Sequence, residues 1–94
     1  LLDGFDDAFM QGKLVPRTYP NPVKHDHLSI DFGEVHDNSV QIDIYSLSGS
    51  LISSRVYPVQ DSMATIDVSQ VPSGVYVLKM IVDSSTFSSR IIRQ

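Results

Sequence analysis

From Tyr19 onward, apolar and polar residues alternate with a period of two, and this pattern restricts the chain to β structure. In residues 28–32, 40–44 and 64–68, the apolar side chains fall on one face of an extended segment and the polar ones on the other. Strands of this kind pack one face on a core and leave the other in water. The pattern therefore predicts antiparallel strands around a single core.

Two later segments complete the predicted strands. Residues 74–83 are apolar on both faces, which predicts a strand in the middle of a sheet, buried on both sides. A strand over 86–93 places Ile91 on one face and Arg90 and Ile92 on the other. With a further short strand near 14–18, the strands recur at intervals of roughly 8–12 residues, which is typical of a β-sandwich.

Turn residues separate these segments. Gly49 can make the turn after the strand over 40–47, because glycine accepts a positive φ at little cost. Residues 83–85 can make the next hairpin, and Pro58 and Pro72 fall at strand ends, where a missing N–H does no harm. The predicted fold is all-β: an immunoglobulin-like antiparallel β-sandwich of about seven strands.

The 94 residues correspond to one domain. Residues 1–16 carry apolar side chains at a roughly helical spacing, flanked by Gly4 and Gly12. A helix this short is marginal in water, so we interpret the segment as a linker. The folded domain is expected over 17–94. The chain opens with Leu1 rather than Met, so we interpret it as a piece of a longer protein. No apolar stretch is long enough to predict a transmembrane segment.

Charge and composition narrow the functional classes. The net charge of −4 argues against a nucleic-acid partner, which needs a basic face. Without cysteine the chain can have neither a disulfide nor a thiolate nucleophile. Residues 46–50 do not form a Gly-x-Ser-x-Gly elbow, and Glu34 is the only glutamate. We therefore predict that the chain is not an enzyme and needs no cofactor.

The best metal candidate is His25-Asp26-His27, in which the two imidazoles share a face of an extended segment. His36 and Asp37 could add ligands. Structural zinc sites need four defined ligands, and histidines in polar stretches are usually solvated, so no metal site is predicted.

Two motifs have a structural interpretation. The prolines at 20 and 22 fix their own φ and favour extended conformations at Tyr19 and Asn21, as in ordinary turn chemistry. Around Gly74, the segment 71–76 resembles the corner of fibronectin-like sandwiches, in which a tyrosine hydroxyl (here that of Tyr76) bonds the upstream backbone. Direct recognition by a partner is the alternative for both motifs.

Three motifs occur in a fixed order along the chain. The first is Tyr19-Pro20-Asn21-Pro22, followed by Leu28 and Ile30. The second consists of Ile42, Ile44, Tyr45, Leu47 and Gly49. The third covers residues 66–69 and 73–79, and a hairpin and residues 91–93 follow it. Over residues 17–94 this arrangement resembles the C-terminal sorting domains of the type IX (Por) secretion system of Bacteroidetes.

The resemblance implies a secretion signal carried at the end of a larger cargo. Such cargo passes through the periplasm, crosses the outer membrane through the type IX translocon, and reaches the cell surface or the extracellular space. A sortase-like cysteine protease commonly removes the domain and anchors the cargo, and the resemblance places that cleavage within residues 1–16; some family members keep the domain.

The physical basis for such a signal is expected at the end of the last hairpin. Residues 90–94 would offer a free edge strand, two cations and a terminal carboxylate, to which a partner could add a strand. A free edge would also permit an edge-strand dimer in isolation. The residues to which we assign the sorting role are Tyr19, Pro20, Asn21, Pro22, Gly49, Gly74, Tyr76, Lys79, Arg90, Ile91, Ile92, Arg93 and Gln94.

Two other functions remain open at this point. One is a retained extracellular adhesion or carbohydrate-binding β-sandwich, and the other is a structural spacer. Carbohydrate-binding modules usually display aromatic platforms, whereas this chain has no tryptophan and only 9% aromatic residues. Composition therefore favours the sorting function over the adhesive one.

Overall fold

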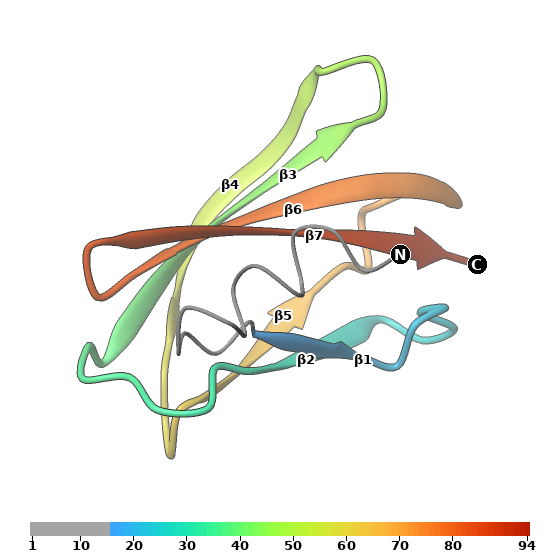
Figure 1. Ribbon diagram of the computed structural model, residues 1–94. Helices are drawn as coiled ribbons and strands as arrows, with labels where there is room; N and C mark the ends of the chain where they lie inside the picture. Colours follow the sequence, from blue (N-terminus) through green and yellow to red (C-terminus); the bar gives the residue numbers. More distant parts are fainter. Residues whose placement is uncertain (1–15) are drawn as a thin grey trace, which may run out of the picture.

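The computed structural model describes residues 16–94, which form two antiparallel β-sheets stacked face to face (Figure 1). The three-stranded sheet has the order β1 (Arg17–Tyr19), β2 (His27–Asp31), β5 (Met63–Asp67). The four-stranded sheet has the order β4 (Leu51–Pro58), β3 (Ser39–Ser46), β6 (Gly74–Val82), β7 (Ser85–Arg93). The predicted all-β sandwich of seven strands is confirmed.

The predicted domain boundary is only partly covered by the structure. Apart from Pro16, the predicted linker lies outside the described residues, as do the first residues of the strand predicted near 14–18. The described part of that strand is β1. Within residues 16–94, no helix is long and apolar enough to cross a membrane.

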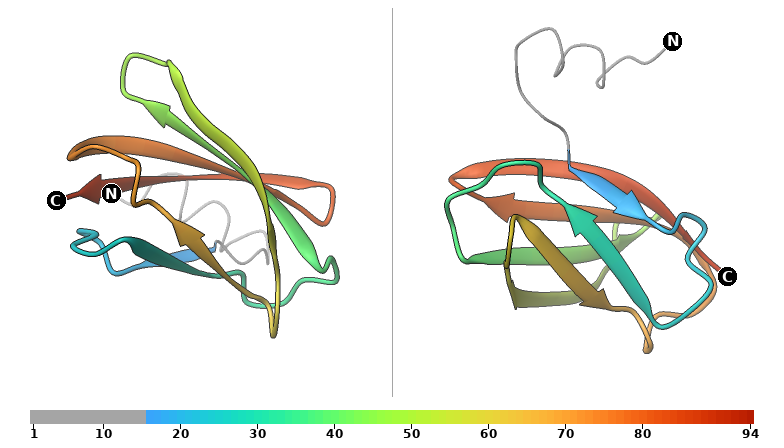
Figure 2. Two further views of the ribbon diagram at one scale, coloured as in Figure 1. Left: turned by 180° about the vertical axis from the view of Figure 1, so that it is seen from behind. Right: turned by 90° about the horizontal axis from the view of Figure 1, so that it is seen from below.

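The core lies between the two sheets (Figure 2) and follows from the alternation in the sequence. In β2, Leu28 and Ile30 are fully buried, and Ser29 and Asp31 between and after them are not. Each large aliphatic side chain buried in this way stabilises the fold by about 1.5–3 kcal/mol. The other fully buried side chains are Val23, Val40, Ile42, Ile44, Ile66, Val68, Leu78, Met80, Val82 and Ile91.

Strand β6 differs from the prediction on one face. It lies between β3 and β7, in the middle of its sheet, as expected. Its inward residues are buried, but Val75, Val77, Lys79 and Ile81 on the outer face are only half-buried. The prediction of burial on both sides was wrong, because the described sandwich has two layers and nothing in residues 16–94 covers this outer face.

The hairpin turns form as predicted. Gly49 has a φ of +93°, and its N–H donates to the carbonyl oxygen of Ser46 at 3.0 Å. Asp83 and Ser84 both have positive φ, the conformation of a two-residue type I′ turn. The Asp83 carboxylate accepts hydrogen bonds from the backbone N–H groups of His36 and Asp37, at 2.8 Å and 2.7 Å. The hydrogen bond from the His36 N–H is the main cause that lowers the pKa of the Asp83 carboxyl group. The same bonds connect this turn to the β2–β3 loop.

Candidate functional site

The sheet register gathers most of the sequence motifs at one end of the sandwich. On neighbouring strands β3, β6 and β7, Ser46 pairs with Tyr76 and Tyr76 pairs with Ile91. The turn that contains Gly49 and the C-terminal end of β7 therefore project from the same end of the sheet. The loop that connects β1 to β2 lies beside the C-terminal end of β7 (Figures 1 and 2).

Residues 20–23, which we call the strap, cover the outer edge of β7. The Asn21 side chain donates from Nδ2 to the carbonyl oxygen of Arg90 at 3.2 Å, and its Oδ1 accepts from the N–H of Ile92 at 3.1 Å. The backbone of Val23 continues this pairing: its N–H donates to the Ile92 carbonyl at 2.6 Å, and its carbonyl accepts from Gln94 at 2.8 Å. The strap thus behaves as a short fifth strand of the sheet.

This pairing corrects the expectation of a free edge at residues 90–94. The outward backbone groups of β7 belong to alternate residues, and those at Ile92 and Gln94 already bond the strap. By the same alternation, the outward groups at Thr86 and Ser88 have no backbone partner within residues 16–94. A free edge remains only in the first half of β7. The sequence did not predict the strap, because an Asn between two prolines gives no signal of a distant strand.

Three of the assigned residues hold the fold, and two of them are buried. Ile91 is fully buried and Tyr76 nearly so. The Tyr76 hydroxyl donates to the Pro72 carbonyl at 2.7 Å, which confirms the predicted tyrosine corner. Gly74 has a φ of +153°, a backbone conformation that other residues rarely adopt. These groups shape the site from within and are not themselves displayed to a partner.

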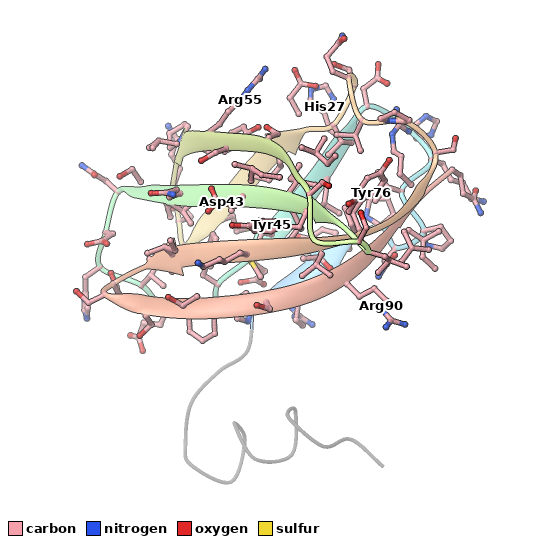
Figure 3. All side chains as sticks on the ribbon, turned by 90° about the horizontal axis from the view of Figure 1, so that it is seen from above. His27, Asp43, Tyr45, Arg55, Tyr76 and Arg90 are labelled. Atoms are coloured by element: carbon pink, nitrogen blue, oxygen red, sulfur yellow. The ribbon has the colours of Figure 1, made fainter. Side chains whose placement is uncertain are left out.

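The side chains that β7 itself displays at this end are those of Arg90, Ile92 and Gln94. Arg90 extends away from β7 into solvent (Figure 3), and it makes no ion pair with any residue of 16–94. Ile92, which is 42% exposed, lies two residues further along the same strand. The end of β7 thus presents a cation and an apolar group next to each other.

The Arg93 side chain is not displayed in this way. It is only 11% exposed and lies 3.3 Å from the Asp26 carboxylate. Of the two cations expected in the signal, only Arg90 is therefore free. Asp26 belongs to the candidate metal motif. No group of three potential metal-binding side chains comes together within residues 16–94.

Two assigned residues lie apart from this end. Lys79 sits in the middle of the outer sheet face, in register with Asp43 on β3 and Ser88 on β7. Tyr19 is 42% exposed on β1, and its hydroxyl lies 3.9 Å from the sulfur of Met63 on the same sheet. The structure therefore separates the assigned residues into a display at the end of β7 and others on the two sheets.

Replacing Asn21 with Ala should destabilise the domain by about 1–2 kcal/mol, because two hydrogen bonds to β7 are lost. The amide of Ile92 should also exchange with solvent faster, since its acceptor is the Asn21 side chain. Urea unfolding and amide hydrogen exchange measure the two effects. Asn38→Ala is the matched control, because only the Asn38 backbone is hydrogen-bonded in residues 16–94. Equal stability of the two variants would contradict the role assigned to the strap.

Comparison with known families gives one extensive match. The family described as "Secretion system C-terminal sorting domain" matches residues 17–94. No curated protein sequence matches the chain.

Two solved structures show the same fold. One is a DUF3244 family protein from Bacteroides vulgatus with an immunoglobulin-like β-sandwich fold, 17% identical, with a TM-score of 0.62 over 84% of this chain and 83% of that one. The other is a thermostable endoglucanase from Alicyclobacillus acidocaldarius, 16% identical, with a TM-score of 0.54 over 72% of this chain and 12% of the enzyme. At these identities the likeness concerns the fold alone.

Proposed function

Because the chain belongs to the family of type IX secretion C-terminal sorting domains, we propose that the end of β7, held by the strap, is the part of the signal that the outer-membrane translocon recognises. The cargo that carries this domain passes through the periplasm and is delivered to the cell surface or the extracellular space. The protease that then separates domain and cargo is of the sortase-like cysteine type.

The observation that carries this proposal is the pairing of the strap with residues 90–94. Four hydrogen bonds fix the backbone on which Arg90 and Ile92 are displayed. A receptor then meets side chains that are already ordered, so little conformational entropy is lost on binding. Strand addition at Ile92 would first have to displace the strap, so recognition proceeds through side chains.

Cleavage is proposed to occur before β1, within the linker over residues 1–16. A protease requires an extended substrate whose backbone groups are available. Arg17 is already paired with Asp31 on β2, and its guanidinium lies 3.1 Å from that carboxylate. A cut inside β1 would require this pairing to open, which favours a scissile bond further upstream.

The test changes the displayed side chains and leaves the backbone in place. Residues 1–94 are fused to a periplasmic reporter in a bacterium with a type IX system, with Arg90→Glu and Ile92→Ser introduced together. We expect export to fall by about tenfold or more, the effect of losing central contacts in a recognition site. The melting temperature of the purified domain should be nearly unchanged, because both side chains are exposed.

Arg55→Glu is the matched control, since Arg55 is an exposed arginine on β4 without an ion pair in residues 16–94. This variant should be exported normally. Normal export of the Arg90→Glu, Ile92→Ser variant would overturn the proposed recognition surface. Retention of the unmodified fusion in the periplasm would instead reject the sorting function of this chain.

A further inference from the structure

The outer face of the four-stranded sheet carries an apolar surface at the end where β7 finishes. Residues directly opposite each other on neighbouring strands lie on the same face, as do residues two apart on one strand. By this rule the register places five apolar residues side by side, which we call the outer patch: Tyr45, Leu51, Val75, Val77 and Ile92. Figure 3 looks onto this face and shows Tyr45 on it. Nothing within residues 16–94 covers the outer patch.

A polar row separates the outer patch from the rest of this face. The row crosses all four strands and consists of Ser54, Asp43, Lys79 and Ser88. The Asp43 carboxylate accepts hydrogen bonds from the Ser54 hydroxyl at 2.6 Å and from the Gln41 side chain at 3.2 Å, so its charge is satisfied within the domain. Beyond the row, Gln41 lies between Val56 and Ile81. The continuous apolar surface is therefore confined to the end of the sheet that includes the end of β7.

The core does not explain why the residues of the outer patch are apolar. In the second sequence motif Ile44 is buried, whereas Tyr45 faces outward. In the third motif Tyr76 and Leu78 are buried, whereas Val77 between them faces outward. Contiguous apolar surface on a folded domain, rimmed by polar residues, is typical of a protein-binding site.

Arg90 borders the outer patch with a charge that the described domain does not balance. It lies directly opposite Val77 on β6 and makes no ion pair with any residue of 16–94. The four strands of this sheet contain one acidic residue, Asp43, and that side chain is buried. A second copy docked on this face would therefore bring apolar groups but no carboxylate for Arg90. A different partner, with a carboxylate next to an apolar surface, complements both parts of the site.

We propose that the translocon covers the outer patch as a third layer over the four-stranded sheet, with an apolar surface on the patch and a carboxylate against Arg90. The inference rests on the proposed recognition of the end of β7, and it adds β6, β3 and the start of β4 to that surface. Sheet pairing on both sides holds β6 and β3, and the strap holds the end of β7. The receptor thus meets one ordered surface, and little conformational entropy is lost on binding.

The first test removes apolar contacts at two positions that the test of the β7 end leaves unchanged. Leu51→Ser and Val77→Thr are introduced together into the periplasmic reporter fusion. We expect export to fall by about tenfold or more, the effect of losing central contacts in a recognition site. The melting temperature of the purified domain should stay within a few degrees of wild type, because both side chains face outward and threonine keeps the β-branched shape.

Two single variants accompany this test. Leu51→Ser alone should lower export in the same direction without loss of the fold, because Leu51 is 56% exposed. Val56→Ser is the matched control: Val56 lies on the same strand, is 67% exposed and falls beyond the polar row. This control should be exported normally. Export of the Leu51→Ser, Val77→Thr variant at the wild-type level, or an equal loss for Val56→Ser, would overturn the outer patch as a contact surface.

The second test concerns the charge of the partner and compares Ile92→Lys with Ile92→Glu. Both variants replace the same exposed apolar side chain with a charged one, so they lose the same apolar contact. A carboxylate on the receptor attracts the lysine and repels the glutamate. We therefore expect the Ile92→Glu cargo to be exported about tenfold less than the Ile92→Lys cargo. Equal export of the two, or weaker export of Ile92→Lys, would overturn the acidic partner.

The outer patch and the proposed function fail in different ways. Normal export of the Leu51→Ser, Val77→Thr variant together with retention of the Arg90→Glu, Ile92→Ser variant would confine recognition to the end of β7 and overturn only the present inference. Normal export of the Arg90→Glu, Ile92→Ser variant would overturn the proposed recognition surface, and the outer patch with it.

Discussion

Removal of residues 90–94 is expected to unfold the domain, and not simply to erase a signal at its end. The deleted stretch contains Ile91, whose side chain is fully buried; loss of such a side chain alone costs about 2–5 kcal/mol. It also removes every β7 partner of the strap, and each of those hydrogen bonds contributes about 0.5–1.5 kcal/mol. The combined loss is comparable with the whole stability of a small domain, about 5–15 kcal/mol.

Thermal and urea unfolding, followed by circular dichroism, measure this effect. The truncated chain should show no cooperative transition. Removal of Gln94 alone is the control, since among residues 16–94 its N–H bonds only the Val23 carbonyl, and that variant should melt within a few degrees of wild type. A truncated chain that melts cooperatively near the wild-type temperature would contradict the structural role of the β7 end.

This result matters for how secretion experiments are interpreted. A truncated cargo that stays in the periplasm can have lost either its recognition surface or its fold. The Arg90→Glu, Ile92→Ser variant separates the two, because both side chains are exposed and neither contributes to the core. For Ile91 and Tyr76, by contrast, a loss of export reports first on stability.

The sequence predicted the strands because each has local alternation, and the tyrosine corner because its donor and acceptor, Tyr76 and Pro72, are four residues apart. The strap could not be predicted in this way. Asn21 and Arg90 are 69 residues apart, and their contact depends on where the two sheets bring β1 and β7. The same holds for the Arg93–Asp26 pair. Period-two alternation fixes which face a residue occupies, but not which strand or loop lies beside it.

The outer face of β6 shows a second limit of the pattern. Val75, Val77 and Ile81 are apolar, so the sequence predicted burial on both faces, yet they are only half-buried. Patterning reports how apolar a face is and not what covers it. On β4, Leu51, Ile52 and Val56 are exposed as well, on an edge strand without an outer neighbour in residues 16–94.

Gly74→Val is expected to destabilise the domain by about 2–3 kcal/mol, because a β-branched residue cannot adopt a φ of +153° without strain. Space is a lesser problem: an added Cβ would lie 3.5 Å from the Tyr76 ring, an ordinary contact. The melting temperature should fall by about 10 °C or more. Circular-dichroism melting measures the change, with Ser73→Val as the control at an adjacent exposed position.

Export of a Gly74→Val cargo should fall in step with the fraction of unfolded domain, because Gly74 shapes the backbone ahead of Tyr76 and displays no side chain of its own. Tyr76→Phe gives an independent point on the same relation. It removes the 2.7 Å bond to Pro72 and should cost about 1–2 kcal/mol, with a smaller loss of export. If Gly74→Val kept the wild-type melting temperature and still lost export, the translocon would contact this corner directly, and the recognition surface would extend from the end of β7 across β6.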